Sequence, residues 1–365
     1  MVVIVKYGDS VLFSTGAKER ISDLFHRKKE IKELEEALRL NEKLTVIYGV
    51  RRTGKTSLIK AVLNEKEWPY VFMDIREIYL KYNSVPIEAF EASITREFMA
   101  FFDKLGLDAN ESDENDFGDG GVTRALKHIN DWCKGKKLNF IIALDEAQYL
   151  RFSGSVKYDM LLAWSMDNLA NIIFVLSGSE VGTLKDFLDY ENVDAPLYGR
   201  FRNDIYLKRF NKEESKGYLE KGFEEFGRKL GNNEVNDVVE KLGGTVGWLS
   251  YYGYYRCVKK FDHNKALEKL FEEGYALTKD ELGKLIRNSS KRYLLILKAI
   301  ASGSNKWSDI KPYVIAKSGK AIKDPQLNNL LQNLVKFGII EKDMLRKEYK
   351  IEDPLILHTV KKMSL

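Results

Sequence analysis

Cysteines and long apolar runs are both scarce in this sequence of 365 residues. The two cysteines, Cys133 and Cys257, lie far apart and have no His or Cys partner at the spacing of a metal site. A disulfide framework or a zinc centre is therefore not expected, and a reducing, cytoplasmic compartment fits best. No stretch approaches the roughly 18 consecutive apolar residues of a membrane helix, so the sequence predicts no membrane partner.

Glutamine is also rare, and the features of a signal peptide are missing. Glutamine occurs only at Gln148, Gln326 and Gln332 while Lys, Glu and Tyr abound, a bias typical of heat-adapted proteins. The first residues, "MVVIVKYGDSVLFS", lack the basic segment and the cleavage site of a secretory signal. They favour a short hairpin that turns at Gly8 and Asp9.

The length and the charge distribution indicate several domains, the last of them basic. A chain of 365 residues is too long for one typical domain, so two or three are expected. From Lys291 to the end there are 15 Lys and Arg against 7 Asp and Glu, a net charge of +8. Because the whole chain carries +5, the first 290 residues sum to −3.

Apolar segments alternate with helical patterns up to about residue 210. The expected strands lie at 44–48, 70–75, within 138–150, at 171–179 and at 203–207, and the expected helices lie within 20–40 and near 86–106, 122–134 and 157–169. An acidic, Gly-rich stretch at 107–121 is predicted to be a solvated loop. Strands that alternate with helices imply an α/β fold with a mostly parallel sheet covered on both faces.

The pattern changes after this region. From about 211 to 285 it is helical only, and the segment 241–253 is predicted to join two helices. The tail predicts three helices and two short strands around Leu345 and Arg346, the order of a winged helix-turn-helix. We therefore expect three domains, at 1–210, 211–288 and 289–365.

The stretch "GVRRTGKT" (49–56) matches G-x-x-x-x-G-K-[ST] at every fixed position, follows a predicted strand and opens a predicted helix. Such a loop wraps phosphates with its N–H groups, and the helix adds the positive end of its dipole. Lys55 is expected to reach the β- and γ-phosphates, and the Thr56 hydroxyl to ligate Mg²⁺. The expected nucleotide-binding residues of the loop are Gly49, Val50, Arg51, Arg52, Thr53, Gly54, Lys55, Thr56 and Ser57. Arg51 and Arg52 are not fixed by the motif, and either face a partner subunit or balance phosphate charge.

The apolar strand at 140–144 ends in Asp145 and Glu146, which is the Walker B pattern. Asp145 is expected to hold Mg²⁺ through water, because a hard cation bound to phosphates prefers carboxylate oxygen. Glu146 follows directly and is placed to orient and deprotonate an attacking water. The pair argues against a nucleotide kinase, which needs an acceptor site rather than an activated water.

Serines end the next predicted strand, in "VLSGS" (175–179). At this place in such a sheet a polar side chain can touch the γ-phosphate or the attacking water, so Ser177 and Ser179 are both candidates. The alternative is that both serines only form the turn that ends the strand.

Together these segments resemble a known family. "VLFSTGAKERISDLFHRKKEIKEL" (11–34), "GVRRTGKTSL", "FIIALDEAQYL" and "LSGS" are similar to the amino-terminal box and the three core motifs of archaeal ATPases of the AAA+/STAND class. The resemblance covers nearly the whole chain. It implies an AAA+-like P-loop NTPase domain, an all-α lid and a winged helix, with ATP or ADP and Mg²⁺ as ligands.

The resemblance assigns further residues to the site. Phe25, Arg27 and Glu30 occupy a Phe-x-Arg-x-x-Glu pattern that lies beside the adenine. Arg200 follows Tyr-Gly in "PLYGRF" (196–201), which implies that it senses or stabilises charge on the γ-phosphate. For Arg200 a buried ion pair is the alternative.

One segment departs from the family pattern. "GGTVGWL" (243–249) is similar to a Gly-Gly-x-Pro segment of the lid in which the proline packs on the base, but Val246 stands in the proline's place. Valine can still pack against a base, although it does not fix φ and it keeps its N–H. Gly244 and Val246 are the candidate lid contacts.

The resemblance also implies a mode of action. In such switches ATP holds the lid and the winged helix closed on the core, and hydrolysis releases them, so turnover is expected to be slow. Two other functions stay open. One is a DNA-binding regulator in which nucleotide is only a structural ligand. The other is an assembly scaffold in which ATP drives ring or dimer formation through the winged helix, so a homo-oligomer or a protein partner is a candidate.

The winged helix carries the features that favour double-stranded DNA as a partner of residues 291–350. The predicted helix at 324–338 has a buried stripe of Leu327, Leu330, Leu331 and Leu334, and a polar face of Gln326, Asn329, Asn333 and Lys336. Amide side chains can read adenine edges, and nearby cations can contact phosphates. These cations are Lys317, Lys320, Lys323, Arg346 and Lys347. A latch within the chain or an oligomer contact is the alternative.

Overall fold

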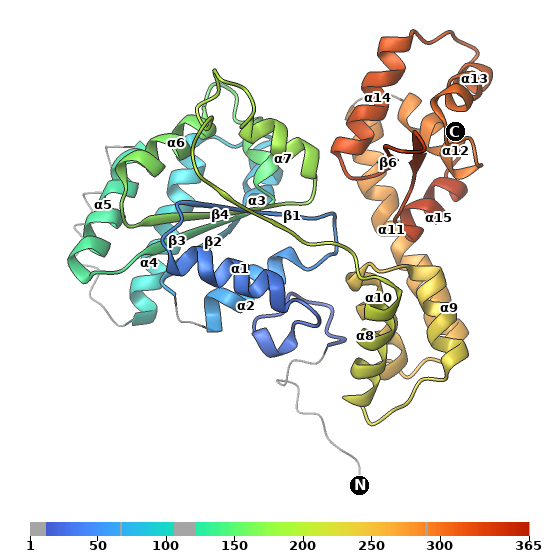
Figure 1. Cartoon of the computed structure of the whole chain (residues 1–365), viewed down its shortest axis with the longest axis horizontal. Helices are drawn as coiled ribbons and strands as arrows, with labels where there is room; N and C mark the ends of the chain where they lie inside the picture. Colours follow the sequence, from blue (N-terminus) through green and yellow to red (C-terminus); the bar gives the residue numbers. More distant parts are fainter. Residues whose placement is uncertain (1–11, 66–67, 106–120, 289–290, 365) are drawn as a thin grey trace. The chain divides into compact units, whose positions relative to one another are not determined.

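The computed structural model describes residues 12–65, 68–105, 121–288 and 291–364 (Figure 1). The predicted hairpin at Gly8 and Asp9 and nearly all of the predicted loop at 107–121 lie outside these ranges. Contacts divide the chain into two compact units. The core unit comprises Ala17–Val50 and Gly54–Lys208. The helical unit comprises the described part of Met1–Gly16, together with Arg51–Thr53 and Arg209–Leu365.

A parallel sheet of five strands, in the order β2-β3-β4-β1-β5, forms the centre of the core unit (Figure 1). The strands are β1 Leu44–Tyr48, β2 Tyr70–Asp74, β3 Phe140–Asp145, β4 Ile172–Gly178 and β5 Asn203–Tyr206. Every residue of β1, β3 and β4 is buried, because these strands are central and both faces of the sheet are covered. The predicted α/β fold with a parallel sheet is confirmed.

Helices account for most of the remaining core unit. They are η1 Ile21–Asp23, α1 Lys28–Arg39, α2 Lys55–Glu65, α3 Ile75–Tyr82, α4 Ile87–Leu105, α5 Gly121–Lys136, η4 Ala147–Phe152, α6 Tyr158–Asn168 and α7 Val181–Leu188. Helices α3 and α7 were not predicted, since each has only eight residues. No helix in the described ranges is long and apolar enough to cross a membrane.

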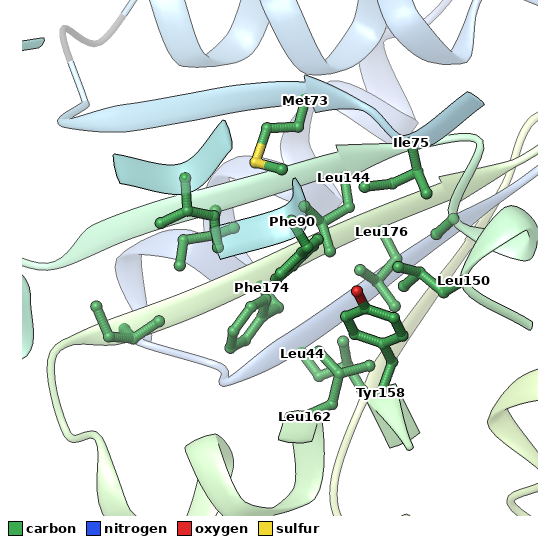
Figure 2. Packing of buried hydrophobic residues seen from close by; sticks show 14 of the residues in the cluster. Leu44, Met73, Ile75, Phe90, Leu144, Leu150, Tyr158, Leu162, Phe174 and Leu176 are labelled. Carbon is green, nitrogen blue, oxygen red and sulfur yellow. The ribbon is translucent and has the colours of Figure 1, made fainter. Parts of the chain in front are cut away.

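The two faces of the sheet take alternate strand residues, as the period of a strand requires. Helices α1 and α2 pack on one face, where Ile47, Ile141 and Val175 are buried. On the other face Leu144, Phe174 and Leu176 pack with residues of α4 and α6 (Figure 2). Both faces are mainly apolar, and apart from Thr45 in β1 the polar residues of the central strands lie at or near their carboxyl ends.

The helical unit contains four helices and then a winged helix. The four are α8 Lys212–Glu224, α9 Asn232–Leu242, α10 Val246–Cys257 and α11 His263–Asn288. The winged helix follows as α12 Arg292–Ala301, α13 Trp307–Ser318, α14 Asp324–Lys336, β6 Glu341–Asp343, β7 Glu348–Lys350 and α15 Pro354–Lys362. Strands β6 and β7 pair antiparallel, which agrees with the predicted wing, whereas α15 was not predicted.

The segment 241–253 does join two helices, as predicted, but most of it is itself helical. Helix α9 ends at Leu242 and α10 already begins at Val246. Only a tight turn separates them, and Gly243 adopts a φ of 61° in it. Gly244 is packed so closely that a Cβ there would lie 1.7 Å from the Phe210 carbonyl oxygen. The geometry of this turn therefore explains why both positions are glycine.

The Phe13 ring is fully buried among the helices of the helical unit. It lies 5.5 Å from Phe223, between ring centroids, and a Cβ at Gly222 or Gly253 would come within 2.3 Å of its ring atoms. The Tyr218 hydroxyl donates to the Leu12 carbonyl at 2.6 Å. The glycines in α8 and α10 thus leave the space that the ring fills.

Both cysteines are free and buried. Burial raises the pKa of the Cys133 thiol to about 12 and that of Cys257 to about 11. Neither thiol is ionised near neutral pH, so both act as small apolar side chains rather than as nucleophiles.

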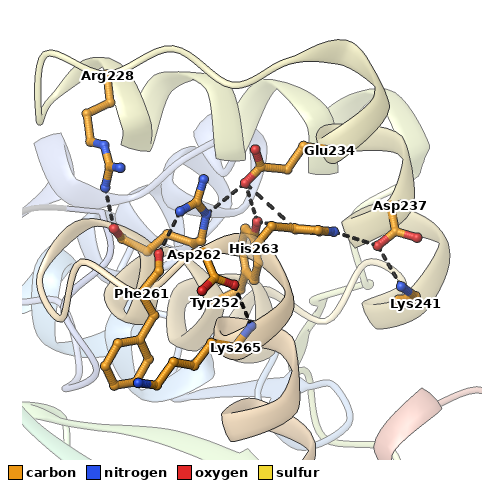
Figure 3. Close-up of polar contacts among 10 residues, drawn as sticks. Arg228, Glu234, Asp237, Lys241, Tyr252, Phe261, Asp262, His263 and Lys265 are labelled. Atoms are coloured by element: carbon orange, nitrogen blue, oxygen red, sulfur yellow. Dashed lines mark hydrogen bonds and ion pairs between the residues drawn. The ribbon is translucent and has the colours of Figure 1, made fainter.

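A polar network joins α9, α10 and the start of α11 (Figure 3). Glu234 accepts hydrogen bonds from Arg256 at 2.7 Å and from the Tyr252 hydroxyl at 2.6 Å. His263 bonds that hydroxyl through Nδ1 at 2.8 Å and Asp237 through Nε2 at 2.9 Å. Burial raises the pKa of Glu234, but the bonds from Arg256 and Tyr252 outweigh it, and the net pKa is lowered.

We expect Glu234→Gln to destabilise the fold at pH 7 by about 1 to 2 kcal/mol, because a charge-assisted pair is lost. The folded-state pKa lies below the ordinary 4.5, so ionised Glu234 stabilises the fold above that pH, and this contribution disappears as the pH falls below it. The difference in the free energy of unfolding between the variant and the wild type should therefore shrink in acid. Urea unfolding followed by circular dichroism at pH 7 and pH 3.5 measures it. The exposed Glu240→Gln is the matched control, and a gap that does not depend on pH contradicts the assignment.

Candidate active site

The predicted motifs meet at the carboxyl ends of the central strands of the core unit. The phosphate loop follows β1, Asp145 ends β3, and Ser177 lies near the end of β4. Strands β1 and β4 are neighbours, as are β3 and β4. This edge of a parallel sheet is where α/β proteins bind their ligands.

Lys55 is the first residue of α2 and is buried. Its ammonium donates to the carbonyl oxygens of Gly49 at 2.7 Å and Val50 at 3.2 Å. Gly54 takes a φ of 97°, a backbone conformation that side chains with a Cβ rarely adopt. The loop thus curves back over the lysine, and a buried cation beside a helix amino terminus fits an anionic group.

Asp145 lies at the centre of the site and is buried. Its Oδ2 accepts from the Thr56 hydroxyl at 2.6 Å, and its Oδ1 accepts from the Ser177 hydroxyl and from the Glu146 N–H at 3.1 Å. The hydroxyl of Thr56 and the carboxylate of Asp145 are hard oxygen donors, and their direct contact fits the needs of Mg²⁺.

A metal ion would need more ligands than the side chains of this site. Within the described part of the chain, no group of three or more His, Cys, Asp or Glu residues could hold a metal ion. Mg²⁺ typically takes one or two protein oxygens and completes its shell with water and substrate phosphates. The donor set at Thr56 and Asp145 fits a cation that completes its shell with water and phosphate oxygens.

Glu146 turns its side chain toward the end of β4. Its backbone is left-handed, with a φ of 53°, and its Oε2 accepts from the Ser179 hydroxyl at 2.6 Å and from the Gln148 amide at 2.5 Å. The two serines therefore have different partners, because Ser177 bonds to Asp145 and Ser179 bonds to Glu146. Gln148 was not predicted, and its only signal is an amide in the turn after the acidic pair.

Two more charged residues border the site and were also not predicted. Asp74 ends β2 in register with Asp145 on β3, and its carboxylate pairs with Arg76 at 2.6 Å. Burial raises the pKa of Asp74, and the charge of Asp145 adds to the shift. The signal in the sequence is a single acid at the end of a buried strand.

The amino-terminal box lies at the start of α1. The buried Arg27 donates to the Lys208 carbonyl at 2.9 Å and lies 3.4 Å from Glu30, so it ties the box to the chain that leaves β5. Phe25 is half-buried and its ring lies 5.9 Å from that of His26. A cavity of about 370 Å³ adjoins the box. Its lining residues are Lys29, Glu30, Glu33, Asp204, Tyr206 and Lys208. Adenine contact by this box stays a prediction.

Ser57 and Arg200 have partners other than the acidic pair. The Ser57 hydroxyl accepts the Lys18 N–H at 3.0 Å. Arg200 pairs with Asp167 at 2.5 Å and also donates to the Pro196 carbonyl. The ion pair considered for Arg200 is thus present, but at the surface, where Asp167 is about half exposed. A role of Arg200 toward a nucleotide stays a prediction.

Arg52 belongs to the phosphate loop by sequence and to the helical unit by its contacts. Its guanidinium pairs with Glu281 at 2.7 Å and lies over the Trp248 ring, 4.2 Å from the centroid. Its carbonyl accepts the Gly247 N–H at 3.1 Å. The charge of Arg52 is therefore balanced by a carboxylate of α11. The predicted lid contact Val246 is the half-buried first residue of α10.

Comparison with known proteins gives two family matches. Residues 24–251 match the model of an ATPase domain found predominantly in Archaea, and residues 272–352 match the carboxyl-terminal winged helix-turn-helix domain of MCM proteins. A search of curated proteins finds no significant match.

Solved structures agree with these matches. The Walker-type ATPase PABY2304 of Pyrococcus abyssi is 36% identical over 96% of this chain and 99% of its own, with a TM-score of 0.87. The ORC2 protein of Aeropyrum pernix, solved as ADPNP-ADP complexes, shares the fold at 15% identity, with 96% of each chain covered and a TM-score of 0.66. The predicted resemblance to archaeal P-loop ATPases with a winged helix is confirmed.

Proposed function

Because the chain belongs to a family of ATPase domains found predominantly in Archaea, we propose that it binds ATP with Mg²⁺, hydrolyses it slowly, and acts as a nucleotide-controlled switch of the STAND type. The observation that carries the proposal is the contact between Thr56 and Asp145 at 2.6 Å, with Glu146 as the next residue. It brings the metal-binding donors and the candidate base together beside Lys55.

Each residue of the cluster has a role in this proposal. ATP supplies the phosphoanhydride bond that water cleaves. Lys55 neutralises charge on the phosphates, and Thr56 and Asp145 hold the cation. Glu146 accepts the proton of the attacking water. Ser177 acts through Asp145, whose carboxylate it orients by a hydrogen bond.

The ligand class has support from one related fold. The ORC2 protein of Aeropyrum pernix was solved with ADPNP and ADP, and its likeness to this chain extends over 96% of both chains. The fit of a buried lysine and a glycine-rich loop to phosphate is the local argument. Adenine as the base and the three domains at 1–210, 211–288 and 289–365 are part of the proposal.

Lys55→Ala and Glu146→Gln separate binding from turnover. We expect Lys55→Ala to abolish ATP binding, because the loop loses its only buried ammonium among the described residues. Glu146→Gln should keep binding and lower the hydrolysis rate by at least about 100-fold, since an amide cannot accept the proton. Calorimetric titration with ATP and a phosphate-release assay measure the two effects.

The matched control for the base is Glu240→Gln, at an exposed position of α9. It should leave both binding and turnover unchanged. Normal turnover by Glu146→Gln would contradict the assignment of Glu146 as the base. Absence of hydrolysis by the wild-type chain would refute the enzymatic part of the proposal.

The switch part of the proposal is supported by contacts inside the helical unit. Arg52 lies over Trp248, and the Trp248 indole N–H donates to Asp353 at 3.0 Å. Asp353 also caps α15, where it accepts the N–H groups of Leu355 and Ile356. A residue of the phosphate loop is thus connected through one tryptophan to the last helix of the winged helix, which gives a route for the nucleotide state to reach it.

We expect ATP to change the tryptophan fluorescence of the protein mainly through Trp248. Displacement of Arg52 from the ring removes a cation–π contact and alters the environment of the indole. The change should be largely lost in Trp248→Phe. It should persist in Trp307→Phe, which removes a half-buried tryptophan of α13 that bonds to Asn328. An equal response from both variants would contradict this route.

Duplex DNA is the second candidate ligand, on account of exposed cations in the winged helix. Lys317, Lys320 and Lys323 are exposed around the end of α13, and Arg346 and Lys347 are exposed in the turn between β6 and β7. Asn333 is less available than predicted, because its amide donates to the Tyr293 hydroxyl at 3.0 Å. These observations favour contact with the phosphate backbone over base recognition.

Replacement of Lys320 and Lys323 by alanine should weaken duplex binding and lower the slope of log K against log salt by up to about two, because each phosphate contact contributes about 0.9. Fluorescence anisotropy between 50 and about 200 mM salt measures the slope. Lys229→Ala, an exposed position between α8 and α9, is the control. No binding at low salt, or an unchanged slope, rules out this surface.

A further inference from the structure

We propose that Gln148 is a positioning residue, which holds the Glu146 carboxylate in the orientation that water activation needs. The inference rests on the proposed function, because it concerns the base of that reaction. It assigns Gln148 a role that no motif gives it and links Ser179 to the same task.

Gln148, Ser179 and Glu146 form a closed triangle of hydrogen bonds. The Gln148 Nε2 lies 2.5 Å from the Glu146 Oε2 and 3.4 Å from the Ser179 Oγ. The Ser179 hydroxyl donates to the same Oε2 at 2.6 Å. Gln148 and Ser179 are each only 1% exposed. Two buried donors from different elements thus converge on one carboxylate oxygen.

Such bonds are strong because the acceptor is charged and both donors are buried. Glu146 itself follows β3 in a left-handed conformation, so the backbone fixes where its side chain starts. The two donors then fix where the side chain ends. A base held at both ends needs little reorganisation when the proton moves.

The packing around Gln148 leaves room for its amide and for little else. A Cβ on Gly178 would lie 2.7 Å from the Gln148 Oε1 and 2.7 Å from the Leu184 Cδ2. The glycine between Ser177 and Ser179 is thus needed to admit the glutamine side chain.

The two polar atoms of the Gln148 amide differ in their hydrogen bonding, and this difference supports a role in the reaction. Among the described residues the Gln148 Oε1 is buried with no hydrogen-bond partner. Leaving a polar atom unpaired costs free energy. An apolar residue of the same size would avoid this cost. The benefit of a glutamine at this position is therefore the hydrogen bond that its Nε2 donates to Glu146.

The role predicts an effect on kcat and not on ATP affinity, because the hydrogen bonds of the Gln148 amide go to Glu146 and Ser179. A base that is free to rotate spends less time in the reactive geometry, and small displacements of reacting groups cost up to about 100-fold in rate.

The test is Gln148→Met, which keeps the length and volume of the side chain but removes the donor. We expect kcat to fall by about 10-fold or more, with the ATP dissociation constant within experimental error of the wild type.

The control is Gln332→Met, the same exchange at an exposed position of α14, which should leave kcat unchanged. Wild-type kcat in Gln148→Met overturns the inference. A rise of kcat in Gln148→Met also overturns it, since that result assigns Gln148 a restraining role. These outcomes differ from failure of the proposed function, in which the wild-type chain itself releases no phosphate.

Discussion

The buried carboxylate of Asp145 is the group on which the arrangement of the site depends. It is buried at the end of β3 and is satisfied by hydroxyls from two other elements, Thr56 on α2 and Ser177 on β4. A buried charge left without such partners costs several kcal/mol, so these three elements are held in one relative position. The phosphate loop, which lies between β1 and α2, takes its place from the same bonds.

The layered packing explains why chemistry is confined to one edge of the sheet. Both faces carry mainly apolar side chains, and a polar group within a central strand is buried without a partner, as the Thr45 hydroxyl of β1 is among the described residues. At the carboxyl ends the strands give way to loops, and side chains such as Ser179 and Gln148 can satisfy one another there. The same rule brings Asp74 next to Asp145, because β2 and β3 pair in register.

Local patterns were enough to predict the strands and the phosphate loop, since apolar runs and fixed glycine spacing are properties of neighbouring residues. These local patterns could not predict contacts between residues that lie far apart in the sequence. Nothing near Arg52 in the sequence indicates Glu281, and nothing near Gln148 indicates that Gly178 makes room for it. Helix α15 was missed although Asp353 and Pro354 form a local start signal, whereas the contact between Asp353 and Trp248 is visible only in the folded chain.

The burial of Trp248 and Asp353 has a consequence for any attempt to cut the chain into modules. The last helix packs on α11 as well, where Thr278 bonds to Thr359 and the Leu355 side chain fills the space left by Gly274. A fragment that starts at α12 would expose these surfaces to solvent and lose the indole partner of Asp353. An autonomous winged-helix reagent would therefore have to carry α10 and α11 with it.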